Sequence, residues 1–136
     1  MRRINKIIIH CTATPEGRPH TVADITRWHK ERGFNDIGYH YVIGLKGETW
    51  IGRMVIIPGA HAQGHNADSI GVCYVGGLTA DKTKPKDTRT PEQKTSLLTL
   101  LKKLKSEYPQ ALIIGHCNVS AKACPSFDAK TEYQNI

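Results

Sequence analysis

Two short apolar runs, each followed by a histidine, constrain this chain more than any other feature. Residues 6–9 (Lys-Ile-Ile-Ile) precede His10, and residues 111–115 (Ala-Leu-Ile-Ile-Gly) precede His116. Runs of this length and composition are typical of buried strands, and the side chain at the end of such a strand emerges at the edge of the sheet. If the two strands are neighbours, the two imidazoles converge. The sequence therefore predicts a sheet with two histidines at one edge.

Cys124 lies on the loop that follows His116 and is placed to bring a thiolate to the same point. Two His and one Cys are typical of catalytic zinc, because structural zinc sites close the tetrahedron with four protein ligands. We therefore predict one Zn²⁺ ion held by His10, His116 and Cys124, with its fourth position open. A structural site that includes Cys11 or Cys117 is the alternative. Adjacent residues on a strand point to opposite faces, so Cys11 is expected to turn away from the metal.

Tyr39 and Lys122 are the candidates for the rest of the chemistry. Zinc with an open position lowers the pKa of bound water toward about 7 and polarises a carbonyl, which suits the hydrolysis of an amide. The reaction also needs a group that handles protons and a charge that stabilises the developing oxyanion. Judged from the residues alone, strand packing for Tyr39 and a solvated loop charge for Lys122 are the simpler interpretations.

Length and composition indicate one domain. A chain of 136 residues is long enough for a core and too short for two, so we expect a single domain over residues 1–136. No segment approaches the roughly 18 consecutive apolar residues of a membrane helix, and membrane insertion is not expected. The first nine residues lack the apolar length of a secretory signal, which predicts synthesis in the cytoplasm.

The chain is basic, with 19 Lys and Arg against 12 Asp and Glu and a net charge of +7, so an anionic partner is expected. Aromatic residues are few and not interleaved with the basic ones, which argues against a nucleic-acid partner. The four cysteines form no C-x-x-C pair, and we expect Cys11 and Cys73 to be small buried residues within strands.

Strands alternate with helices, which predicts an α/β fold with a central mixed β-sheet flanked by helices. Thr21 and Asp24 form a capping box for a helix that ends at Gly33. Thr90 and Gln93 form a second capping box, which begins a longer helix with Pro91 at its first position; this helix ends before Pro109. The other expected elements are a hairpin of strands over 39–45 and 50–51, a loop over 58–67, a central strand over 69–75 and a polar surface loop over 76–89.

Five segments carry a resemblance to a known family. They are residues 9–14 (IHCTAT), 27–30 (RWHK), 38–41 (GYHY), 69–77 (SIGVCYVGG) and 122–128 (KACPSFD). In order and spacing they resemble the small bacteriophage lysozymes that are zinc amidases, in the N-acetylmuramoyl-L-alanine amidase and peptidoglycan recognition protein superfamily. The similarity spans nearly the whole chain.

The resemblance implies that His10, His116 and Cys124 bind zinc and that Tyr39 and Lys122 assist catalysis. It also implies the bond that is cut, the amide between the lactyl group of N-acetylmuramic acid and the L-alanine of the stem peptide. The expected protein is a phage or prophage endolysin, monomeric, whose partner is peptidoglycan and which acts on the cell wall after release.

The resemblance also places residues 59–66 at the border of the cleft. His61 and Asn66 are then candidate substrate contacts, and a glycine-rich surface turn is the alternative. His40 is expected to face away from Tyr39 across the strand and is left out of the site.

One feature departs from the family pattern. Many relatives carry Arg-Asp after the second zinc histidine, whereas this chain has Cys117-Asn118. An asparagine still accepts a hydrogen bond in a turn, so we expect an effect on the loop or on substrate contact rather than loss of metal.

Three other functions remain open at this point. Some relatives bind peptidoglycan without cutting it, but these typically lack the metal cysteine that this chain retains at Cys124. A nucleic-acid or regulatory protein is suggested only by charge. An enzyme that acts on recycled wall fragments in the cytoplasm fits the sequence as well as a lytic one.

Overall fold

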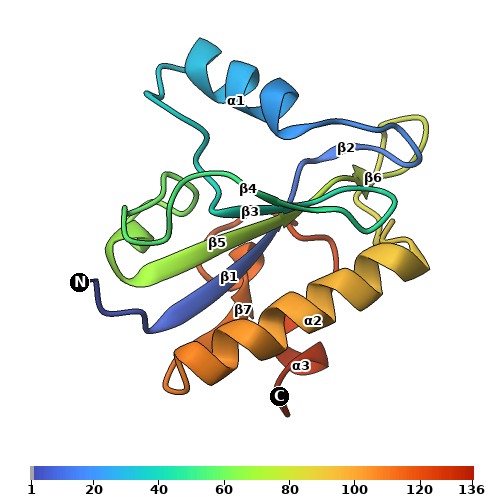
Figure 1. Cartoon of the computed structure of the whole chain (residues 1–136). Coiled ribbons are helices and arrows are strands. Elements are labelled where there is room, and N and C mark those ends of the chain that lie inside the picture. Colours follow the sequence, from blue (N-terminus) through green and yellow to red (C-terminus); the bar gives the residue numbers. More distant parts are fainter. Residues whose placement is uncertain (1) are drawn as a thin grey trace.

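The computed structural model describes residues 2–136 and contains a five-stranded sheet with the strand order β4-β3-β5-β1-β7 (Figure 1). Strands β1, β3, β5 and β7 are parallel, and only the β3–β4 hairpin is antiparallel. The sheet is therefore mixed, as the sequence predicts. Its strands are β1 (Lys6–Cys11), β3 (Tyr41–Ile43), β4 (Thr49–Ile51), β5 (Ser69–Tyr74) and β7 (Leu112–Gly115).

Two helices lie on opposite sides of the sheet, α1 (Val22–Glu31) and α2 (Pro91–Glu107) (Figure 1). Both begin with the predicted capping boxes: the Thr21 hydroxyl accepts from the Asp24 backbone, and the Thr90 hydroxyl accepts from the Gln93 backbone. A reciprocal side-chain bond completes each box and satisfies a second free N–H at the helix start. No helix within residues 2–136 is both long and apolar enough to cross a membrane.

The main core lies between α2 and one face of the sheet. The side chains that α2 buries there are Leu97, Leu100, Leu101 and Leu104. Ile7 and Ile9 of β1 belong to this cluster, whereas Ile8 packs in a separate cluster with Ile114 of β7. Successive side chains of a strand alternate between faces, so His10 shares the face of Ile8. The metal-binding candidates therefore lie on the face of the sheet that α2 does not cover.

The strand predicted to begin at residue 39 begins at Tyr41. Tyr39 and His40 precede it, and the alternation of a regular strand does not apply to them. The Tyr39 ring lies 5.1 Å from that of His10, and the His40 ring lies 5.9 Å from that of His61. His40 is fully buried and accepts a hydrogen bond from the Gly71 backbone, which gives it a structural role.

Residues 76–89 were predicted as a polar surface loop, and this prediction is partly wrong. A short strand, β6 (Gly77–Leu78), pairs in parallel with β2 (Thr14–Pro15) to form a second, two-stranded sheet. The segment also ends in buried residues, Thr88 and Arg89. A two-residue strand has too little periodicity to be read from sequence.

Arg89 is buried against the last helix, α3 (Ala129–Glu132). Its guanidinium donates to the carboxylates of Asp87 and Glu132 at 2.8 to 2.9 Å and to the Tyr133 hydroxyl at 2.7 Å. It also lies over the Phe127 ring, 3.4 Å from the centroid. These contacts connect the end of the 76–89 segment to the C-terminal residues.

Replacement of Arg89 by alanine is expected to lower the free energy of unfolding by about 3 kcal/mol. This is the low end of the cost of removing one partner of a buried ion pair, because Glu132 is 44% exposed and regains water. Denaturant titration measures it. The control is Lys86→Ala, which removes an exposed ion pair to Glu16 and is expected to cost less than about 1 kcal/mol. Equal losses in the two variants would contradict the structural role of Arg89.

Candidate active site and metal centre

His10 lies near the end of β1 and is 1% exposed. Its Nδ1 atom lies 3.7 Å from the Sγ atom of Cys124, so this nitrogen faces the other candidate ligands. Burial lowers the pKa of His10 well below its ordinary value, and the neighbouring His61 and His116 lower it further. The ring is therefore neutral at pH 7, which is the form that binds a metal.

His116 is half-buried and follows directly after β7 in a single 3-10 turn, residues His116–Asn118. Its ring centroid lies 4.5 Å from that of His10. The Asn118 side chain accepts a hydrogen bond from the Gly115 backbone at 2.8 Å, which holds the turn. The asparagine at this position therefore makes the kind of turn contact expected of it.

Cys124 lies on the loop before α3, close to His10 and His116. Its Sγ atom accepts a hydrogen bond from the Cys11 backbone at 3.2 Å, and its carbonyl accepts from the Cys117 backbone at 2.7 Å. The Cys11 side chain belongs to the core cluster on the α2 side of the sheet, and Cys117 is exposed. The Cys11 side chain thus packs on the face of the sheet opposite His10, as strand alternation predicts, but its thiol also lies in hydrogen-bond contact with the thiol of Cys124.

The three candidate ligand atoms of His10, His116 and Cys124 lie within 4.8 Å of one another. Zinc binds sulfur at about 2.3 Å and imidazole nitrogen at about 2.0–2.1 Å, which separates S and N by about 3.5 Å in a tetrahedral site. The observed separation of 3.7 Å between Cys124 Sγ and His10 Nδ1 fits this geometry. Two imidazoles and one thiolate are also ligands that zinc prefers. The donor set fits the predicted ion.

A cavity of about 180 Å³ lies over these ligands, and Tyr39 and Lys122 both line it. Burial raises the pKa of Tyr39 well above its ordinary value, so its phenol is neutral and able to donate a hydrogen bond. Lys122 is exposed, and its charge lowers the pKa of His116 in addition to the larger effect of burial. The structure brings both predicted catalytic side chains to the predicted metal ligands.

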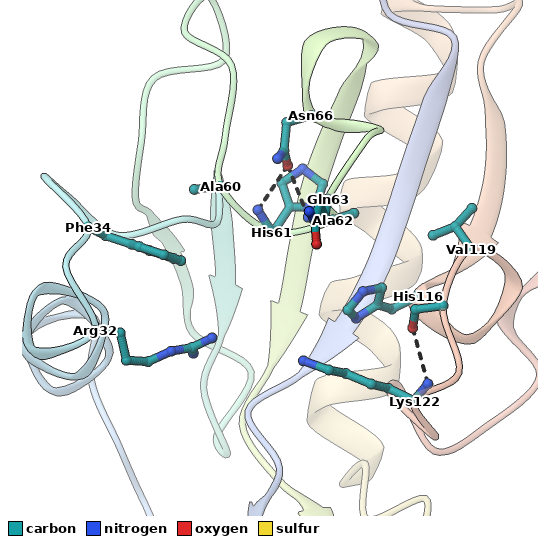
Figure 2. A pocket seen from close by; sticks show the side chains of 11 residues that line it. Arg32, Phe34, Ala60, His61, Ala62, Gln63, Asn66, His116, Val119 and Lys122 are labelled. Carbon is teal, nitrogen blue, oxygen red and sulfur yellow. Dashed lines mark hydrogen bonds between the residues drawn. The ribbon is translucent and has the colours of Figure 1, made fainter.

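A wider pocket of about 580 Å³ opens beside this cavity (Figure 2). His61 and Asn66 line it, as predicted for residues at the border of a cleft. The Asn66 side-chain oxygen accepts from the backbones of His61 and Ala62 at 2.9 and 3.0 Å, an arrangement that also fixes the loop. Their contact with substrate stays a prediction.

Two residues that line the pocket, Arg32 and Phe34, were not predicted from the sequence. Both follow α1. The Arg32 guanidinium lies 5.4 Å from the Phe34 ring centroid. Figure 2 shows Arg32 and Lys122 extending toward each other from opposite walls. No Asp or Glu is among the described residues that line either cavity, so the local charge is positive. Arg32 follows the last residue of α1, and nothing in the sequence around it signals this position.

His29 of α1 also lines the smaller cavity. Its Nδ1 atom accepts a hydrogen bond from the Gly38 backbone at 2.8 Å, and its ring packs 5.2 Å from that of Tyr39. Burial lowers the pKa of His29 to about 4, so it is a neutral acceptor. His29 therefore holds the segment that carries Tyr39 in place.

A mixed sheet that presents two histidines and a cysteine at one cavity is the arrangement expected of the amidases that the sequence resembles. The chain belongs to the N-acetylmuramoyl-L-alanine amidase family, whose profile matches residues 1–127. It is therefore an amidase that acts on peptidoglycan in cell-wall lysis, as the sequence resemblance predicts. The match includes the three candidate ligands and the two candidate catalytic residues.

Curated relatives and solved structures agree with this assignment. The endolysin of Escherichia phage T7 is 45% identical over 124 residues, which are 91% of this chain and 82% of that protein. The endolysin of Klebsiella phage KP32 is 43% identical over 126 residues, 93% of this chain and 83% of that protein. The amidase LysC from Clostridium intestinale superposes with a TM-score of 0.81 at 30% identity and covers 96% of this chain and 82% of its own. Drosophila PGRP-LB superposes with a TM-score of 0.80 at 26% identity, and the match covers 99% of this chain and 82% of that protein.

If His10, His116 and Cys124 bind zinc, the purified protein is expected to contain one zinc ion per chain. Cys124→Ala removes the thiolate and leaves two imidazoles, so zinc is expected to be lost on dialysis against a weak chelator that wild type withstands. Elemental analysis of protein and metal after dialysis measures the ratio. The control is Cys73→Ala, a buried cysteine that lines neither cavity and is expected to keep the ion. Retention of a full equivalent by Cys124→Ala would exclude this ligand set.

Proposed function

We propose that the protein is a zinc-dependent hydrolase of the amide bond between N-acetylmuramic acid and L-alanine in peptidoglycan. One observation carries the zinc dependence: the ligand atoms of His10, His116 and Cys124 lie within 4.8 Å of one another beneath a cavity. Family membership supplies the bond, because the family is named for this amidase activity. The match to phage endolysins supports a role in lysis.

Bound zinc would polarise the scissile carbonyl and activate water for attack. The chain supplies the rest of the environment. His10 and His116 are held neutral by burial. The neighbouring Cys11 thiol and burial raise the pKa of Cys124, so its thiolate would form on binding the metal, where the hydrogen bond from the Cys11 backbone N–H would stabilise it. These contacts fix the ligands before substrate arrives, so that little reorganisation is needed during the reaction.

Tyr39 and Lys122 would act on the substrate. The neutral phenol of Tyr39 lies beside the ligand His10 and donates a hydrogen bond toward the carbonyl oxygen. The Lys122 ammonium faces the same cavity and stabilises the negative charge that develops there. It is also a proton donor for the departing amine. Both roles need only the positions that the structure gives these residues.

The wider pocket would hold the stem peptide, whose carboxylates suit a pocket lined by Arg32 and Lys122. His61 and Asn66 are proposed to contact the substrate through the surfaces they expose to this pocket. Two relatives were solved with peptidoglycan fragments: PGRP-LB and the PGRP-LCa and PGRP-LCx complex each hold tracheal cytotoxin. This agreement supports peptidoglycan as the partner.

We further propose a monomer that is made in the cytoplasm and reaches the cell wall after release, in line with its endolysin relatives. The amidase domain is proposed to extend over residues 1–136, beyond the family match at 127. Ala129 and Tyr133 pack in the main core, so the residues after the match belong to the same folding unit.

Purified peptidoglycan incubated with zinc-loaded protein is expected to release free stem peptides that begin with L-alanine, identified by mass spectrometry. A chelated sample is expected to release none. New reducing sugar ends would instead indicate a glycosidase, and wall binding without release would indicate a recognition protein.

Tyr39→Phe and Lys122→Ala are expected to lower kcat by about 10²–10⁴-fold, as the loss of a proton-transfer or oxyanion contact does. Both variants should keep one zinc ion, because neither side chain is a ligand. Lys102→Ala, on the exposed side of α2, is the matched control and should retain full activity. Full activity in Tyr39→Phe or Lys122→Ala would remove that residue from the mechanism.

A further inference from the structure

His61 uses both of its ring nitrogens within the protein. Its Nδ1 atom lies 2.8 Å from Nε2 of the candidate ligand His10, and its Nε2 atom lies 3.2 Å from the hydroxyl of Ser69. The His10 and His61 rings meet edge to face, 4.9 Å apart. A continuous chain of hydrogen bonds therefore runs from the candidate metal ligand to a fully buried serine at the start of β5.

The direction of these bonds follows from the chemistry of the ligand. Nδ1 of His10 faces Cys124 Sγ, so this nitrogen is the one available to a metal. The proton of a neutral, metal-binding imidazole must then lie on Nε2, which donates to Nδ1 of His61. His61 in turn carries its proton on Nε2 and donates to Ser69.

The surrounding backbone is built to hold the His61 ring. A Cβ atom at Gly71 would lie 2.6 Å from Cγ of the ring, and one at Gly59 would lie 2.6 Å from its Cδ2. Glycine at both positions leaves the space that the imidazole fills. The Asn66 side chain accepts from the His61 backbone and fixes the loop from the other side. The ring is thus held by close contacts, as expected of a group whose orientation matters.

We propose that His61 is a positioning residue for the metal centre, which orients His10 and fixes its proton on Nε2 so that Nδ1 is free to bind zinc. The proposal rests on the zinc site described under the proposed function. It assigns His61 a role beyond substrate contact, with Ser69 as the second member of the chain. Removal of such a partner from a metal-binding histidine weakens metal affinity by about 10–100-fold.

Zinc affinity of three variants tests the proposal by competition with a chromophoric chelator. His61→Ala is expected to bind zinc about 10–100-fold more weakly than wild type. His61→Gln keeps an oxygen acceptor for His10 and an N–H donor for Ser69, so it should recover most of this loss. The control is His20→Ala, a histidine that lines neither cavity, which should bind zinc as wild type does.

Wild-type affinity in His61→Ala would overturn the proposal. An affinity in His61→Gln as weak as in His61→Ala would also overturn it, because filling of space rather than hydrogen bonding would then be responsible. Denaturant unfolding of the metal-free variants separates these outcomes from loss of the fold. If His61→Ala does not fold, two other measurements test the proposal in its place. They are the zinc affinity of Ser69→Ala and the nitrogen NMR spectrum of wild type.

In zinc-loaded wild type, long-range ¹H–¹⁵N spectra should show His61 with its proton on Nε2 and none on Nδ1. The reverse tautomer would contradict the chain of hydrogen bonds. Neither measurement depends on peptidoglycan. Failure of the amidase assay with the expected zinc affinities would therefore reject the proposed reaction and leave the positioning role standing.

Discussion

The parallel pairing of β1 with β5 and β7 is the constraint on which the site depends. The register sets Ile8 beside Gly71 on one side and Ile114 on the other. Partners in a parallel pair share a face, so the face that carries His10 also carries Gly71 and leads to His116 just beyond β7. A slip of one residue would turn His10 into the core beneath α2. The apolar core on the α2 side thus fixes the geometry of the polar site on the other.

The same register explains how the histidine side chains of the site are arranged around Gly71. Gly71 contributes no side chain, and the His61 ring occupies the space above it. His40 accepts a hydrogen bond from the Gly71 backbone, and the ring of His29, on α1, packs against that of Tyr39. Burial keeps these three histidines neutral by lowering the pKa of each. His29 and His61 line the smaller cavity together with Arg32 and Lys122, so uncharged imidazoles and positively charged side chains share this site.

Much of the fold follows from local patterns in the sequence. The capping boxes at Thr21 and Thr90 and the apolar runs around Ile8 and Ile70 each depend on neighbouring residues, and the structure confirms them. The convergence of His10 and His116 was predictable because the ends of neighbouring parallel strands meet at one edge of a sheet, and Cys124 follows on the loop after His116.

What could not be predicted depends on contacts between distant segments. Arg89 was read as a surface charge because its partner Glu132 lies 43 residues away in the sequence. The β2–β6 pair is too short to show a pattern, and the contact between His10 and His61 spans 51 residues. Arg32 lines the pocket only because of the way in which α1 is set against the sheet. Each of these features is a product of tertiary packing rather than of local sequence.

X-ray absorption at the zinc edge of the metal-loaded protein tests the central claim most directly. The account predicts one sulfur ligand at about 2.3 Å and nitrogen or oxygen ligands at about 2.0–2.1 Å, with the sulfur lost in Cys124→Ala. Two sulfur ligands would mean that Cys11 or Cys117 joins the site and closes it as a structural centre. A zinc environment without sulfur would place the ion elsewhere and contradict the proposed active site.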